Sequence, residues 1–183
     1  MDRKIRKKKG RGFTLIELLV VIAIIGILST VVVMNTNSSK AKARDAVRKA
    51  ILVQLKVALA LYKDFNGSYP TTGGIWYSSE TGDTVPNNTG NWVPGLVPNY
   101  VDILPKDPRG GDSLFTNVGC IEATVRVKSA FRYLSNSTDY VLLANCSPES
   151  GLSGSDEFYD SNRASYAWKV CSNNDIVNPG CGW

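Results

Sequence analysis

The chain has 183 residues, with 21 Lys and Arg residues against 16 Asp and Glu residues, and it contains no histidine. This length suits one modest domain with appendages. The lack of histidine excludes Ser-His-Asp and Cys-His catalysis and any histidine-ligated metal. Because no other nucleophile arrangement is recognisable, we expect a protein that is not an enzyme.

The formal net charge of +5 comes from a basic leader, residues 1–12. The leader holds seven Lys and Arg residues and one acid, a net of +6, whereas the other 171 residues hold 14 basic and 15 acidic residues, a net of −1. Outside the leader there is no general basic surface of the kind that nucleic-acid binding needs. Nucleic acid is therefore a disfavoured partner, and the leader instead fits the excess of positive charge on the cytoplasmic side of membrane proteins.

A long apolar run follows, residues 13–34, in which Glu17 is the only charged residue. A helix of this length crosses a hydrocarbon core of about 30 Å, and the run is longer than the apolar core of a cleaved secretory signal. We therefore expect a single-pass membrane helix, with a plain signal anchor as the simplest alternative. A carboxylate in such a helix is costly and demands a reason.

The junction between the leader and the apolar run carries a family resemblance. The string KKGRGFTLIELLVVI, residues 8–22, resembles the N-terminus of type IV prepilins and type II secretion pseudopilins. The resemblance implies that a prepilin peptidase in the membrane cuts between Gly12 and Phe13 and then methylates the new N-terminus at Phe13. It also implies that Glu17 serves assembly, because its carboxylate would pair with the Phe13 amine of its own or a neighbouring subunit at membrane depth.

Residues 35–65 form the amphipathic second half of the same predicted helix. Its expected apolar face, with spacings mostly of three and four, consists of Val47, Ala50, Ile51, Gln54, Leu55, Ala58, Tyr62 and Phe65. Its expected solvent-facing side carries Lys42, Arg44, Asp45, Arg48, Lys49, Lys56 and Lys63. Asn66-Gly67 predicts the end of the helix, because glycine readily adopts the left-handed conformation of a helix C-cap.

Residues 66–183 are expected to form a globular head, so that the whole chain has an α+β fold like that of type IV pilins. In this fold a small antiparallel sheet packs on the exposed half of the long helix. A long loop over residues 71–122 is expected to be anchored by Trp76, Trp92 and Tyr100, with a short helix near 97–103. Alternating or apolar β-rich runs predict strands at 122–128, 130–134, 140–144 and 166–170, the middle two forming a hairpin.

The four cysteines, Cys120, Cys146, Cys171 and Cys181, all lie beyond the apolar run. An even number of cysteines on the exported side of a membrane predicts two disulfides, here in the C-terminal region of the head. Three connectivities are open, one of which closes a terminal loop between Cys171 and Cys181. Buried free thiols are the alternative.

Some major pseudopilins bind calcium in a C-terminal loop, and the resemblance therefore raises the question of a calcium site. The candidate oxygen ligands are Asp156, Glu157, Asp160 and Asp175. They lack the spacing of an EF-hand, so a solvated acidic loop without a cofactor is favoured.

The function that we expect is that of a structural subunit of a type IV pilus-like filament. The implied partners are copies of the chain itself, prepilin peptidase, an inner-membrane assembly platform and the membrane. The subunit would sit in the inner membrane before assembly and in an extracellular or periplasmic filament afterwards. The alternative is a major-type pseudopilin of a type II secretion system, which the segments 66–72 and 104–108 favour because they resemble that branch. A DNA-uptake competence pilin is less favoured, since it would rest on a small basic patch of Arg126, Lys128 and Arg132.

Overall fold

A computed structural model of the chain describes residues 12–83, 85, 90–110, 120–122, 125–126, 128–163 and 166–172. For residues 30–35, 121–122 and 125–126 it describes the backbone alone. The chain divides into two compact units, Met1–Lys40 and Ala41–Trp183. Helix α1, Leu15–Asn66, contributes its first part to one unit and its second part to the other.

In the first unit, the described side chains of α1 are exposed all round, from Leu15 to Ser29. Most of them are large and aliphatic. Among the residues that the structure describes, no helix has both the length and the apolar character needed to cross a membrane. The predicted span, residues 13–34, includes residues 30–34, whose side chains lie outside that description.

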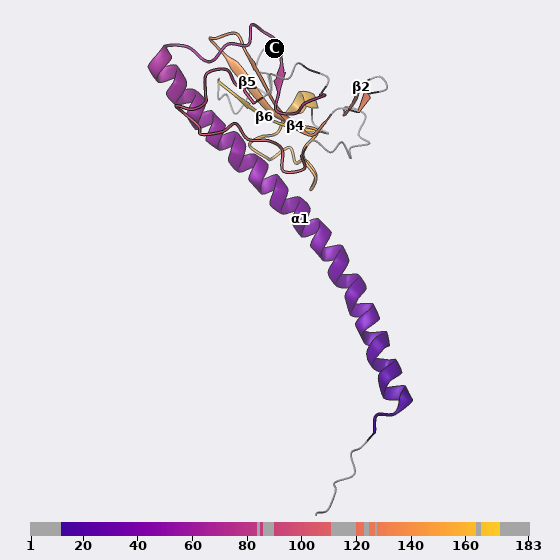
Figure 1. Ribbon diagram of the computed structural model, residues 1–183. Helices are drawn as coiled ribbons and strands as arrows, with labels where there is room; N and C mark the ends of the chain where they lie inside the picture. Colours follow the sequence, from indigo (N-terminus) through magenta and orange to yellow (C-terminus); the bar gives the residue numbers. More distant parts are fainter. Residues whose placement is uncertain are drawn as a thin grey trace, which may run out of the picture. The chain divides into compact units, whose positions relative to one another are not determined.

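The second unit is an α+β domain, as expected from the strand signals. Strands β4 (Ala130–Ser135) and β5 (Tyr140–Asn145) form the predicted hairpin, and β6 (Ala167–Cys171) pairs with β5. The short strand β1 (Tyr77–Ser78) completes a four-stranded antiparallel sheet in the order β1-β4-β5-β6. Figure 1 shows β4, β5 and β6 side by side next to the second part of α1.

Two predictions for the loop and the strands need correction. The strand expected over 122–128 is a separate two-stranded ribbon of β2 (Ile121–Glu122) and β3 (Val125–Arg126). No helix forms over residues 97–103, where the chain makes turns instead. The described part of the chain also contains a short 3₁₀ helix, η2 (Ser161–Arg163).

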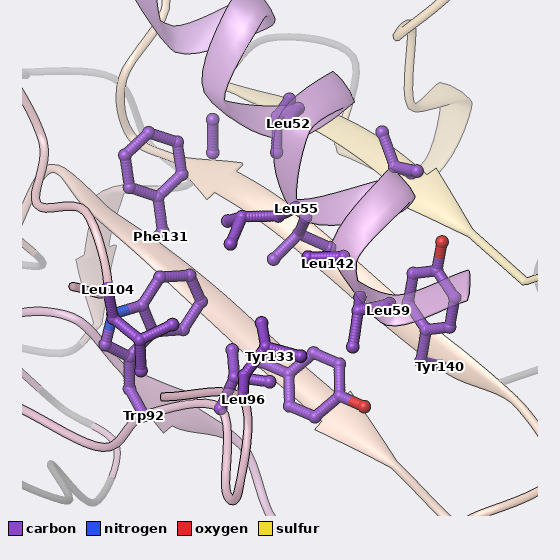
Figure 2. Packing of buried hydrophobic residues seen from close by; sticks show 14 of the residues in the cluster. Leu52, Leu55, Leu59, Trp92, Leu96, Leu104, Phe131, Tyr133, Tyr140 and Leu142 are labelled. Carbon is purple, nitrogen blue, oxygen red and sulfur yellow. The ribbon is translucent and has the colours of Figure 1, made fainter. Parts of the chain in front are cut away.

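The core lies between α1 and one face of the sheet. Leu52, Leu55 and Leu59 extend from the helix toward strands β4 and β5, and Trp92 closes the core from the loop, where it stacks on Phe131 (Figure 2). Side chains alternate along β5, so that the remaining strand positions face the other side of the sheet. There Val141 and Leu143 pack with Trp76, which explains why every residue of β4 and β5 is buried.

The end of α1 falls where the sequence predicted it. Gly67 follows Asn66 with φ +75° and donates its backbone N–H to the carbonyl of Lys63 at 2.8 Å. A residue with a Cβ atom is disfavoured in this left-handed conformation. The glycine therefore lets the chain leave the helix, after which Tyr69 N donates to the carbonyl of Ser137, in the turn between β4 and β5, at 2.8 Å.

Candidate assembly site

The predicted cleavage site lies just before the first helical residue. Helix α1 begins at Leu15, and Gly12, Phe13 and Thr14 precede it without regular secondary structure. The Phe13 side chain is 83% exposed. The Gly12–Phe13 bond is therefore free of helical hydrogen bonds and accessible, which are the properties that a peptidase substrate needs.

Glu17 closes the first turn of α1 by a reciprocal pair of hydrogen bonds with Thr14. The Glu17 Oε2 atom accepts from the Thr14 backbone N at 2.8 Å and from the Thr14 Oγ1 hydroxyl at 2.7 Å. In return, the Glu17 backbone N donates to Thr14 Oγ1 at 3.3 Å. This is a capping box, which satisfies backbone donors that a helix N-terminus leaves unpaired.

The capping box changes the interpretation of Glu17. The resemblance implies the Phe13 amine as the partner of its carboxylate, yet Thr14 already provides a partner in the uncut chain. The Thr-x-x-Glu spacing at residues 14–17 was the signal in the sequence that could have revealed this. The negative charge of Glu17 also lies at the N-terminal end of the helix, where the macrodipole favours an anion.

The buried face of the second part of α1 includes two charged residues. Asp45, Arg48, Leu52, Leu55 and Leu59 follow one another at spacings of three and four, and all are buried. The predicted faces were therefore wrong in phase. Of the expected apolar face, Leu55 and Ala58 are buried and Ile51 and Tyr62 are half-buried, but Val47, Ala50, Gln54 and Phe65 are exposed. Of the expected solvent-facing side, Lys42 and Lys63 are exposed, Arg44, Lys49 and Lys56 are half-buried, and Asp45 and Arg48 are buried.

Arg48 is the centre of a set of six charged side chains that we call the charged cluster, made of Arg44, Asp45, Arg48, Asp107, Arg109 and Glu149. The Arg48 side chain is fully buried. Its Nε and Nη2 atoms each donate to Asp107 at 2.8 Å, a bidentate pair. Its Nη1 atom donates to Asp45 at 2.8 Å and to Glu149 at 2.7 Å.

The charged cluster is balanced and closely hydrogen-bonded. Three cations face three anions, so that no net charge is buried. Burial would raise the pKa of Glu149, but hydrogen bonds from Arg44 and Arg48 lower it to about 2. Ser147 Oγ donates to Asp107 at 2.9 Å, and the Ser150 backbone N donates to Asp45 at 2.7 Å. Such completeness matters because a buried charge that lacks partners is strongly destabilising.

Sequence reasoning missed the charged cluster for identifiable reasons. Asp107 stands in the segment LPKDP, residues 104–108, which reads as a turn, and Glu149 stands in a polar loop. The usable signal was on the helix, since Asp45 and Arg48 continue the spacing of Leu52, Leu55 and Leu59. Charged residues in phase with a leucine stripe indicate a buried ion pair rather than a solvated face.

The disulfide prediction is confirmed for one pair. Cys120 and Cys146 are bonded, with their Cα atoms 5.7 Å apart, and both are fully buried. Cys171 is also in a disulfide. Cys181 lies outside the described residues. Among the described cysteines none is free.

Two of the candidate calcium ligands that the structure describes are paired with cationic side chains. Asp156 pairs with Lys49, and the buried Asp160 accepts from Arg163 at 3.0 Å and lies 3.2 Å from the Lys169 ammonium. Glu157 is exposed, and Asp175 lies outside the described residues. In the described part of the chain no three His, Cys, Asp or Glu side chains form a group that could hold a metal ion.

The predicted basic patch is not a stripe on one strand. Arg132 is buried in β4 and forms a bidentate pair with Asp83 at 2.7 and 2.9 Å. Lys128 donates to the Thr81 carbonyl at 2.7 Å, and Arg126 belongs to the separate ribbon strand β3. The patch therefore does not provide three solvent-facing cations for nucleic acid.

Comparisons with known proteins support the resemblance that the junction carries. The family described as the prokaryotic N-terminal methylation motif matches residues 7–33. The type II secretion system core protein G of Escherichia coli strain K12 is 40% identical over 111 residues, covering 61% of this chain and 74% of that protein. The core protein G of Vibrio cholerae is 38% identical over 114 residues, covering 62% of this chain and 75% of that protein. No solved structure matches the chain.

The methylation motif, the long N-terminal helix and the small antiparallel sheet define the class of pilin-like proteins that carry a prepilin-type N-terminus. Within that class the identity to the curated relatives is decisive. The chain belongs to the type II secretion system core protein G family.

Proposed function

We propose that the chain is a structural, non-enzymatic subunit of a type II secretion filament, the pseudopilus. Prepilin peptidase would cut it after Gly12 and methylate Phe13. The subunit would sit in the inner membrane through residues 13–34 and then enter a periplasmic filament with other pseudopilins, through an inner-membrane assembly platform. The observation that carries this proposal is the similarity to core protein G of type II secretion systems, which favours the secretion alternative over the pilus that the sequence first indicated.

The exposed apolar surface of α1 supports assembly. In the first unit Leu15, Ile22 and Ile27 are each more than 60% exposed, and an all-round apolar helix needs lipid or other subunits around it. In the second unit Val53, Val57 and Leu61 are about half exposed. They lie on the side of the helix opposite Leu52, Leu55 and Leu59. A second copy of the chain, with the same apolar helix, is the occupant that suits both surfaces.

The role of Glu17 can be tested because two substitutions separate its charge from its capping function. Glu17→Gln removes the charge but keeps an amide oxygen that serves a capping box, whereas Glu17→Ala removes both. If the charge pairs with the Phe13 amine, both variants are inserted and cleaved but assemble poorly. N-terminal sequencing measures cleavage, and sedimentation of sheared filaments measures assembly. Filament yield from Glu17→Gln equal to that of the unmodified chain would falsify the pairing.

A complementation experiment can distinguish a subunit of a secretion system from a subunit of a pilus. We expect the chain to restore protein export in a bacterium whose own core protein G gene has been deleted, provided that its peptidase and platform accept the chain. A variant with Gly12→Val, which places a branched side chain at the cleavage site, serves as a matched control and should restore nothing. Surface pili without restored export would support the pilus alternative instead.

A further inference from the structure

The segment that brings Glu149 to the charged cluster begins at a disulfide. We call residues 146–150 the strap. Cys146 is bonded to Cys120, Ser147 donates to Asp107, and the backbone N–H groups of Glu149 and Ser150 donate to Asp45 at 3.0 and 2.7 Å. The strap thus joins the end of β5 to the part of α1 that carries Asp45 and Arg48.

The turn at the start of the strap is a strained one. Cys146 has φ +52°, a left-handed conformation that a residue with a Cβ atom disfavours. It is held there by the bond to Cys120 and by Ser129, whose Oγ donates to the Cys146 carbonyl at 2.6 Å. Such a conformation persists only where the surroundings over-determine it. Loss of the covalent bond therefore favours an extended strap.

An extended strap would deprive Arg48 of a partner. Only two residues separate Cys146 from Glu149, so a change of backbone direction at Cys146 moves the Glu149 carboxylate directly. Arg48 would then remain buried with Asp45 and Asp107 while Arg44 loses its bidentate partner. Since an incompletely paired buried charge is unfavourable, α1 would be released from the head near Arg48.

We propose that the Cys120–Cys146 disulfide is a redox-dependent lock that couples docking of the head on α1 to export of the head from the cytoplasm. Forming the bond takes two electrons and two protons from the two thiols. A protein disulfide oxidant in the exported compartment accepts them and becomes a dithiol. The reducing cytoplasm keeps thiols reduced, so the strap would close only after the head has crossed the membrane. The claim that the head is exported from the cytoplasm rests on the proposed function. The claim that the disulfide controls docking of the head on α1 does not.

Trypsin cleavage of the full-length chain in detergent tests the lock. Trypsin cuts after Arg, and Arg48 is fully buried in the docked state. Arg132 reports on the sheet because it is also buried and lies in β4. In the Cys120→Ser/Cys146→Ser variant we expect cleavage after Arg48 to be about tenfold faster or more, since cleavage follows the population of the open form. Cleavage after Arg132 should change less than about twofold.

Two further variants make every outcome informative. Glu149→Ala, with both cysteines intact, should speed cleavage after Arg48 as the double cysteine variant does. Cys171→Ala, which breaks the other disulfide, should leave that rate unchanged. The lock is overturned if the double variant is cleaved at the original rate, if Arg48 and Arg132 become accessible together, or if Cys171→Ala acts equally. Filament assembly is not measured, so these results and those on the proposed function are independent.

Discussion

The two parts of α1 differ in which kinds of side chain they expose and bury. In the first unit, Leu18 and Ile22 are each about 60% exposed. In the second unit the same helix buries Asp45 and Arg48 almost completely. Exposed aliphatic side chains indicate a surface that awaits a partner, whereas buried charges indicate a partner already in place. The second part of the helix therefore already has its partners within the head, including partners for its charged residues, while the first part keeps an apolar surface for assembly.

The largest effect should come from removing the bidentate partner of Arg48. Asp107→Ala leaves a fully buried guanidinium with half of its hydrogen bonds, and we expect the free energy of unfolding to fall by about 3–5 kcal/mol. Urea unfolding of the chain in detergent, followed by tryptophan fluorescence, measures it. Asp102→Ala removes an exposed carboxylate five residues away and should change stability by less than about 0.5 kcal/mol. Equal effects of the two variants would mean that the charged cluster does not hold the head.

The next prediction compares two leucines of the same helix. Leu52 is fully buried in the head core, whereas Leu18 is 60% exposed. Leu52→Ala should lower the free energy of unfolding of the head by about 3 kcal/mol, because it removes buried methyl groups and leaves a cavity. Leu18→Ala should leave head unfolding unchanged and affect assembly alone. A loss of head stability in Leu18→Ala would show that the two units are not independent.

How much of this could be foreseen differs between the elements. The hairpin 130–145 and the helix end at Gly67 were predictable, because alternation and a left-handed glycine are local signals. The face of α1 was not, since its phase depends on Asp107 and Glu149, which lie about 60 and 100 residues farther along the chain. At the N-terminus the sequence motif predicts the cleavage site. The hydrogen bonds between Thr14 and Glu17 are also predictable, because the Thr-x-x-Glu spacing of a capping box is a local signal.

A smaller effect is expected from pH, acting through Glu149. Its pKa is about 2 in the folded chain, against about 4.3 for an unperturbed glutamate. Because the folded pKa is lowered, the stabilisation is present above about pH 4.3 and is lost as the pH falls toward 2. It is worth about 3 kcal/mol in all, of which roughly 2 kcal/mol is lost by about pH 3. The unmodified chain should therefore lose more stability than Glu149→Gln over this range. Glu157→Gln, at an exposed position, should follow the profile of the unmodified chain.

The smallest expected effect is a gain of stability, and it concerns a buried charge without the partners that Arg48 has. Glu80 is buried, and its Oε1 atom has no hydrogen-bond partner. Burial raises its pKa, although Lys106 and Lys128 oppose this shift. Since the folded pKa is raised, folding favours the neutral carboxyl more than the unfolded chain does, and stability is lost as the pH rises from about 4.3 through the folded pKa.

Glu80→Gln, which is neutral at every pH, should therefore raise the free energy of unfolding by about 1 kcal/mol at pH 7 and leave it nearly unchanged at pH 4. Glu149→Gln is the matched comparison, because it should destabilise at pH 7 through loss of its pairs with Arg44 and Arg48. Thermal unfolding of both variants at the two pH values distinguishes the cases. If Glu80→Gln also destabilises at pH 7, the attraction of Lys106 and Lys128 for the Glu80 carboxylate outweighs the cost of burying it. The head would then tolerate buried charge at positions outside the charged cluster as well.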